Sequence, residues 1–223
     1  MAYLGQDYRT YALDFWGFGE SGKKKPTFAV QDFVKMVDQF MEHLGISQAP
    51  LVGHSMGGTV SLSVAIQYPE RVRKVVVIGS PIVGSSLALI LKLAGYRWNA
   101  WMVFHAMWAL HLGLRASSRW ITRDPRWYEM ISHDLSRTTL ESFLLSISSL
   151  RKTDLRPHLS QIQIPALGMY GDKDIIVNPN QWQLMANRMT NVNIQRFENA
   201  GHFIMLDEPK AFMETLSTFL SNE

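Results

Sequence analysis

A short apolar run that ends in a cluster of glycines limits the folds open to this chain. Residues 50–52 (Pro-Leu-Val) lead into residues 53–58 (Gly-His-Ser-Met-Gly-Gly), and a helical segment follows up to Tyr68. An apolar run of this length bounded by glycine is typical of a buried strand. Flanking glycines let a strand and a helix approach closely. The sequence therefore predicts a strand, a sharp turn at Ser55 and a helix, a unit typical of parallel sheets.

The same alternation of apolar runs and helical segments recurs along the chain. Further strands are predicted at residues 8–13, 72–78, 166–170 and 192–197. Helices are predicted at residues 28–44, 181–189 and 209–220. This order predicts the α/β fold class, with a mostly parallel sheet flanked by helices.

Three residues mark the expected ends of these helices. Thr27 precedes the first helix and is a residue type that caps helix N-termini, whereas Gly45 follows the same helix and is typical of a C-terminal stop. Asp207, with Pro209 close behind it, is the expected start signal of the last helix.

The alternation of strand and helix patterns stops between Gly79 and about Leu150. This region holds five of the seven tryptophans and has the pattern of helices without strands. Residues 98–114 carry no full charge, but this stretch is slightly short for a membrane span. We therefore expect a helical cap at 81–150, inserted into a core formed by 1–80 and 151–223.

Composition narrows the function classes. The 223 residues are 47% hydrophobic and 18% charged, as in a compact folded domain. A net charge of +3 gives no argument for nucleic acid as a partner, and the lack of cysteine excludes thiolate metal sites. No signal peptide is visible at the N-terminus, so a cytoplasmic location is expected. Nothing in the chain requires a cofactor.

Ser55 becomes a nucleophile only if a base and an orienting acid lie near it. Of the seven histidines, only His202 lies in a loop just after a late strand, at the edge where open α/β sheets bind ligands. Two carboxylates, Asp172 and Asp174, follow the strand at 166–170. The order serine, aspartate, histidine is one that serine hydrolases use. Both aspartates remain candidates for the acid on these grounds.

Four motifs together resemble the α/β-hydrolase superfamily, in the branch with a helical cap after the sixth strand. The motif D-x-x-G-x-G-x-S is formed by Asp14, Gly17, Gly19 and Ser21, and G-x-S-x-G is formed by Gly53, Ser55 and Gly57. The motif G-x-x-D is formed by Gly171 and Asp174, and Gly-His is formed by Gly201 and His202. The resemblance implies Ser55 as nucleophile, His202 as base and Asp174 as acid. It also implies that the backbone N–H of Met56 stabilises the oxyanion.

The function that this resemblance implies is hydrolysis of carboxylic esters or related acyl substrates through an acyl-enzyme. Trp98, Trp101 and Trp108 are candidate contacts for a small apolar substrate, although these rings could equally serve to pack the cap. Two alternatives stay open. The same triad could hydrolyse C–C bonds or support cofactor-free peroxidation, or the chain could be a non-catalytic, truncated member.

The resemblance also raises an expectation about the start of the chain. Residues 8–13 and 50–52 correspond to the fourth and fifth strands of the superfamily, and no His-Gly oxyanion loop precedes Asp14. We therefore expect that roughly 40–60 residues, enough for three strands with their connections, precede this sequence in a longer enzyme. The 223 residues expressed alone would then aggregate or show weak esterase activity.

A basic stripe in the expected cap could contact a membrane surface weakly. It comprises Arg115, Arg119, Arg123 and Arg126, with Trp120 and Trp127 beside them. Basic residues with interfacial tryptophans can hold a helix at anionic lipid. A solvated helix face explains the stripe as well and is the favoured interpretation. The oligomeric state is not determined by any of these patterns.

Overall fold

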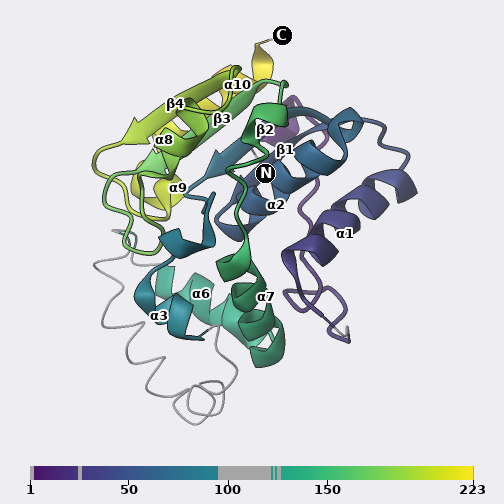
Figure 1. Ribbon diagram of the computed structural model, residues 1–223, viewed down its shortest axis with the longest axis vertical. Helices are drawn as coiled ribbons and strands as arrows, with labels where there is room; N and C mark the ends of the chain where they lie inside the picture. The colour runs from purple at the N-terminus through teal and green to yellow at the C-terminus, as the bar shows by residue number, and fades with distance from the viewer. Residues whose placement is uncertain (1–2, 25–26, 95–121, 123, 125–126, 223) are drawn as a thin grey trace.

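Four parallel strands lie side by side in chain order in the computed structural model, which describes residues 3–24, 27–94, 122, 124 and 127–222 (Figure 1). The strands of this described sheet are β1 (Ala49–His54), β2 (Val72–Ile78), β3 (Ala166–Gly171) and β4 (Val192–Phe197). Every neighbouring pair is parallel, so all four carboxyl ends lie at one edge of the sheet. Residues that follow the strands are thereby brought together.

Helices connect the strands and cover the sheet (Figure 1). Those of the core are α1 (Val30–His43), α2 (Met56–Gln67), α8 (Gln181–Ala186), α9 (Ile204–Asp207) and α10 (Pro209–Ser221). Those between β2 and β3 are α3 (Leu89–Ala94), α6 (Trp127–Ser136) and α7 (Leu140–Lys152).

Alternate side chains of β2 divide the apolar core between the two faces of the sheet. Val75 and Val77 are fully buried with residues of α1, α2 and α7 on one face. Val76 and Ile78 pack on the other face with residues of α9 and α10. Because both faces are covered, five of the seven residues of β2 are β-branched and apolar. The predicted α/β class with a parallel sheet is confirmed.

Three of the predicted strands agree closely with the structure. The strands expected at 72–78 and 192–197 occur with those bounds, and the one expected at 166–170 is longer by Gly171. The helix expected at 181–189 is shorter and ends at Ala186, whereas the last helix extends to Ser221.

The strand predicted at residues 8–13 is wrong. This segment has no regular secondary structure, and the described sheet begins with β1. Tyr11 packs edge-on against Phe40 of α1, with ring centroids 5.8 Å apart, and the guanidinium of Arg9 lies over the Tyr11 ring. Strand-like composition is not sufficient here, because a strand forms only where a neighbour completes its hydrogen-bond ladder.

The first helix begins later than predicted, and Thr27 is not its N-cap. The cap position is Ala29, whose backbone N–H donates to the carboxylate of Asp32 at 2.9 Å. The hydroxyl of Thr27 donates to the same carboxylate, so Thr27 supports the first turn from outside. At the other end Gly45 has a φ of 66°, the left-handed conformation that ends many helices, as predicted.

Asp207 does not start the last helix. It is the final residue of α9, and Glu208 occupies the cap position before α10. The carboxylate of Asp207 instead accepts the backbone N–H of Gly201 at 2.7 Å. A carboxylate near a helix start satisfies whichever donor the tertiary structure brings closest, and here that donor belongs to another loop.

The described residues of the region expected to form a cap contain helices and no strand beyond isolated bridges at Val83 and Leu87, and α3, α6 and α7 gather at one end of the sheet (Figure 1). The stripe formed by Trp98, Trp101 and Trp108 lies outside the described residues, as do the four arginines and Trp120. Trp127 is described and is only 2% exposed. Within the described parts of the chain, no helix is both long and apolar enough to cross a membrane.

Candidate active site

Ser55 lies on a strained turn between β1 and α2. Its φ of 53° and ψ of −122° make it the one non-glycine residue with positive φ in the described chain. Its backbone N–H donates to the carbonyl of Ile78 at 2.8 Å, which fixes the turn against the end of β2. Such a conformation costs about 1–3 kcal/mol and is kept where the surrounding structure enforces it. The turn therefore has the geometry expected of a nucleophile that projects from a sheet edge.

Gly53, which precedes this turn, is required because a side chain at this position would clash with the backbone. A Cβ built on Gly53 would lie 2.3 Å from the carbonyl carbon and oxygen of Gly57, much closer than real atoms approach. The backbone of α2 thus lies directly against the end of β1. Only glycine permits this contact. The N-terminus of α2 therefore lies at the turn, next to Ser55.

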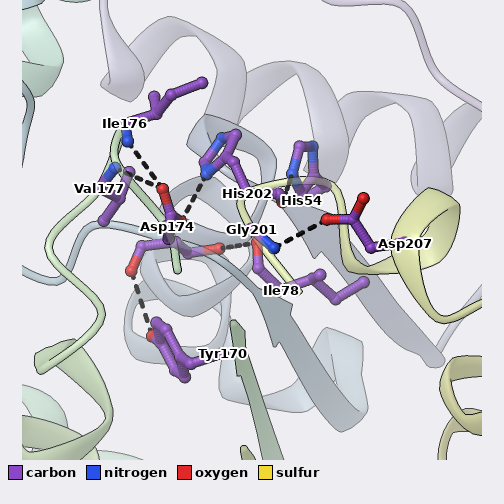
Figure 2. A network of polar contacts seen from close by, with 10 residues as sticks. His54, Ile78, Tyr170, Asp174, Ile176, Val177, Gly201, His202 and Asp207 are labelled. Carbon is purple, nitrogen blue, oxygen red and sulfur yellow. Dashed lines mark hydrogen bonds and ion pairs between the residues drawn. The ribbon is translucent and has the colours of Figure 1, made fainter. Parts of the chain in front are cut away.

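Asp174 and His202 form a buried pair at the same sheet edge (Figure 2). The Nδ1–H of His202 donates to Oδ2 of Asp174 at 2.7 Å, and the two side chains are 4% and 1% exposed. The other oxygen, Oδ1, accepts the backbone N–H groups of Ile176 and Val177 at 2.8 and 2.9 Å. These bonds hold the carboxylate in place, and Nδ1 protonation leaves Nε2 of a neutral imidazole free to accept a proton.

Asp172, the other carboxylate considered from the sequence, has a different partner. Both of its oxygens accept from the guanidinium of Arg196, at 3.0 and 2.8 Å. The pair joins the residue after β3 to Arg196 on β4, and the carboxylate of Asp172 has no hydrogen bond to His202 among the described contacts. The geometry therefore supports Asp174 over Asp172 as the acid.

Ser55 and His202 lie near each other, but their side chains are not hydrogen-bonded. Among the described residues no hydrogen bond links the Ser55 hydroxyl to the imidazole, although the ring of His202 lies 4.6 Å from that of His54, the residue before Ser55. Catalytic hydrogen bonds are often long or misaligned before substrate binds. Met56, the predicted oxyanion donor, is the first residue of α2, so no carbonyl of that helix accepts its N–H.

The structure adds His54 to the site, a residue that sequence reasoning treated only as part of the turn. Its Nε2–H donates to the carbonyl of His202 at 2.9 Å, and its ring also contacts Phe203 at 5.2 Å between centroids. Burial and the neighbouring charge of His202 lower the pKa of His54 to about 3. His54 is therefore neutral at ordinary pH and serves as a hydrogen-bond donor.

Tyr170 lies below the Asp174–His202 pair and was also missed (Figure 2). Its hydroxyl donates to the carbonyl of Ser80 at 3.1 Å. Burial, with a smaller effect from the charge of Asp174, raises the pKa of Tyr170 well above its ordinary value. Tyr170 thus stays neutral and supports the floor of the site. No group of three or more metal-ligating side chains is clustered within the described residues.

Comparisons with known proteins identify the family of this chain. A family profile described as serine aminopeptidase, S33, matches residues 2–209. The curated 3-oxoadipate enol-lactonase 2 of Acinetobacter baylyi is 27% identical over 217 residues, which cover 95% of this chain and 78% of that protein.

Solved structures show the same fold. The enol-lactonase from Burkholderia xenovorans superposes with a TM-score of 0.84 at 23% identity, covering 99% of this chain and 84% of that one. An esterase from Exiguobacterium antarcticum gives a TM-score of 0.80 at 19% identity, covering 94% and 80%. Because the family match extends over nearly all of its residues, this chain is a hydrolase of the α/β-hydrolase superfamily and belongs to the family described as serine aminopeptidase, S33.

Proposed function

We propose that the chain is a serine hydrolase of carboxylic esters or related acyl substrates, with Ser55, His202 and Asp174 as its catalytic triad. The observation that carries this proposal is the buried 2.7 Å hydrogen bond between His202 and Asp174, at the edge where the strained turn presents Ser55. That bond orients the imidazole so that Nε2 can take the serine proton.

The reaction follows from these groups. His202 removes the proton of the Ser55 hydroxyl, and the oxygen attacks the acyl carbonyl to give a tetrahedral oxyanion. The backbone N–H of Met56 stabilises this oxyanion, and a donor of this kind contributes about 3–4 kcal/mol. His202 then protonates the leaving alcohol, and water releases the acyl group by the same steps. Asp174 stabilises the imidazolium that forms at each stage.

The substrate class rests on two kinds of support. Relatives named as an enol-lactonase and an esterase are consistent with esters, including cyclic ones. The described side chains that pack beside His202 are aromatic, because Phe203 meets the His202 ring at 5.3 Å and the buried Trp127 ring at 5.9 Å. Residues 81–150 act in this proposal as a helical cap over an apolar acyl group.

A matched pair of aspartates tests the triad. A fluorophosphonate probe should label Ser55, and Ser55→Ala should abolish both labelling and hydrolysis of p-nitrophenyl butyrate. Asp174→Asn should lower kcat by about 10⁴-fold, since the imidazole loses its orienting acceptor. Asp172→Asn removes a carboxylate two residues away and should leave kcat within about threefold of the original. Equal losses in the two asparagine variants would refute the assignment of the acid.

A further inference from the structure

The loop that carries His202 is held from two sides by side chains outside the proposed triad (Figure 2). On one side, the carbonyl of His202 accepts from Nε2–H of His54 at 2.9 Å. On the other, the N–H of Gly201 donates to Oδ2 of Asp207 at 2.7 Å. Gly201 has no side chain, so Asp207 reaches this residue through its backbone N–H, while the carbonyl of the preceding Ala200 accepts the N–H of Lys173 at 3.0 Å.

Asp207 also reaches a distant part of the chain. Its second oxygen, Oδ1, accepts the hydroxyl of Thr122 at 2.6 Å, across 85 positions of sequence. Thr122 is only 5% exposed. It precedes α6, whose first residue, Trp127, packs edge-on against Phe203, the residue after His202. The expected cap therefore meets the His202 loop at two points.

We infer that Asp207 is a positioning residue for His202 and couples the position of this base to the segment at Thr122. Bonds from a carboxylate to N–H and O–H donors are short and strong, so one side chain fixes both partners in the same frame. This inference rests on the proposed function, since His202 is the base only if the triad is correct. A misplacement of about 1 Å near the reacting atoms can cost about 10²-fold in rate.

Steady-state kinetics on p-nitrophenyl butyrate test this role. Asp207→Ala should lower kcat by about 10–100-fold with KM changed less than about threefold, because the base moves but the substrate pocket does not. Asp207→Asn should retain kcat within about threefold, since the amide oxygen can still accept from Gly201 and the amide nitrogen can donate to the Thr122 oxygen. A kcat for Asp207→Ala within threefold of the original would overturn the inference.

Thr122→Val tests the link to the cap by removing the hydroxyl that donates to Asp207 and accepts the N–H of Asp124, and the double variant with Asp207→Ala separates these two bonds. This variant keeps the size and shape of the side chain and the bond between Asp207 and Gly201, so it should fold. It should lower kcat by about 3–10-fold, and it should have no further effect in the Asp207→Ala background, because Thr122 acts through Asp207. An unchanged kcat, or effects that multiply fully in the double variant, would overturn the coupling.

A readout without substrate separates this inference from the proposed function. By NMR, hydrogen exchange of the Gly201 amide should be at least about tenfold faster in Asp207→Ala, and close to the original in Asp207→Asn. Full activity in Ser55→Ala would refute the triad, but the exchange rate of the Gly201 amide would still test the contact between Asp207 and Gly201. Unchanged Gly201 protection in Asp207→Ala would show that Asp207 does not hold the loop.

Discussion

His54 shows at the residue scale how an ionisable ring can lie beside a base without competing for its protons. Desolvation disfavours the charged form, and a second positive charge next to His202 would be repelled, so the pKa of His54 is about 3. The unfolded chain, with an ordinary value near 6.5, binds more protons than the folded chain between these limits. Stability supplied by neutral His54 is thus complete above about pH 6.5 and is lost as the pH falls toward 3.

His54→Gln should flatten this pH dependence. Urea unfolding at several pH values from 7 to 4 should show the free energy of unfolding declining more steeply in the original protein, by up to about 1.4 kcal/mol per pH unit. His43→Gln, at the exposed end of α1, is the control and should keep the original slope. Parallel slopes in the original and His54→Gln proteins would contradict a buried neutral His54.

At the scale of elements, Gly53 and Gly57 at the junction between β1 and α2 have opposite requirements for space. A Cβ at Gly53 would lie 2.3 Å from the backbone of Gly57, whereas a Cβ at Gly57 has nothing within 4 Å. Gly53→Ala should therefore lower the free energy of unfolding by about 1–3 kcal/mol or more, because strand and helix must separate. Gly57→Ala should raise it by up to about 1 kcal/mol, since alanine favours a helix. Urea titration compares the two, and equal destabilisation would argue against a close contact at Gly53.

The match between sequence and structure also differs between elements. Strands β2 and β4 have the bounds that their apolar patterns predict, because local composition and burial on the sheet agree there. Residues 8–13 have a similar composition but form no strand. For such a segment the choice between strand and coil depends on a neighbouring strand, and no pattern within the segment reports on that neighbour.

For the whole molecule, β1 forms one of the two edges of the described sheet, opposite β4. β2 has partners on both sides, whereas β1 pairs only with β2 among the described strands, and Val52 on β1 is 44% exposed. Unpaired apolar edges tend to pair with other chains, and a lysine on the edge suppresses this. Val52→Lys should therefore reduce self-association, measured by light scattering over a range of protein concentrations. Met130→Lys, which alters a 38% exposed residue on α6, should not. An equal reduction in both variants would point to net charge instead of the edge.

Local patterns were sufficient to predict the α/β class, the sharp turn at Ser55, and His202 with two candidate aspartates, because these depend on short motifs and on residues that follow strands; the choice of Asp174 came from the resemblance to the superfamily. Which carboxylate meets His202 depends on the folded chain, since Asp172 and Asp174 are two residues apart, yet Asp172 pairs with Arg196 and Asp174 is buried against His202. The contacts of His54 with the His202 loop also depend on the folded chain. They join residues 148 positions apart, and contacts of that kind exist only once the chain has folded.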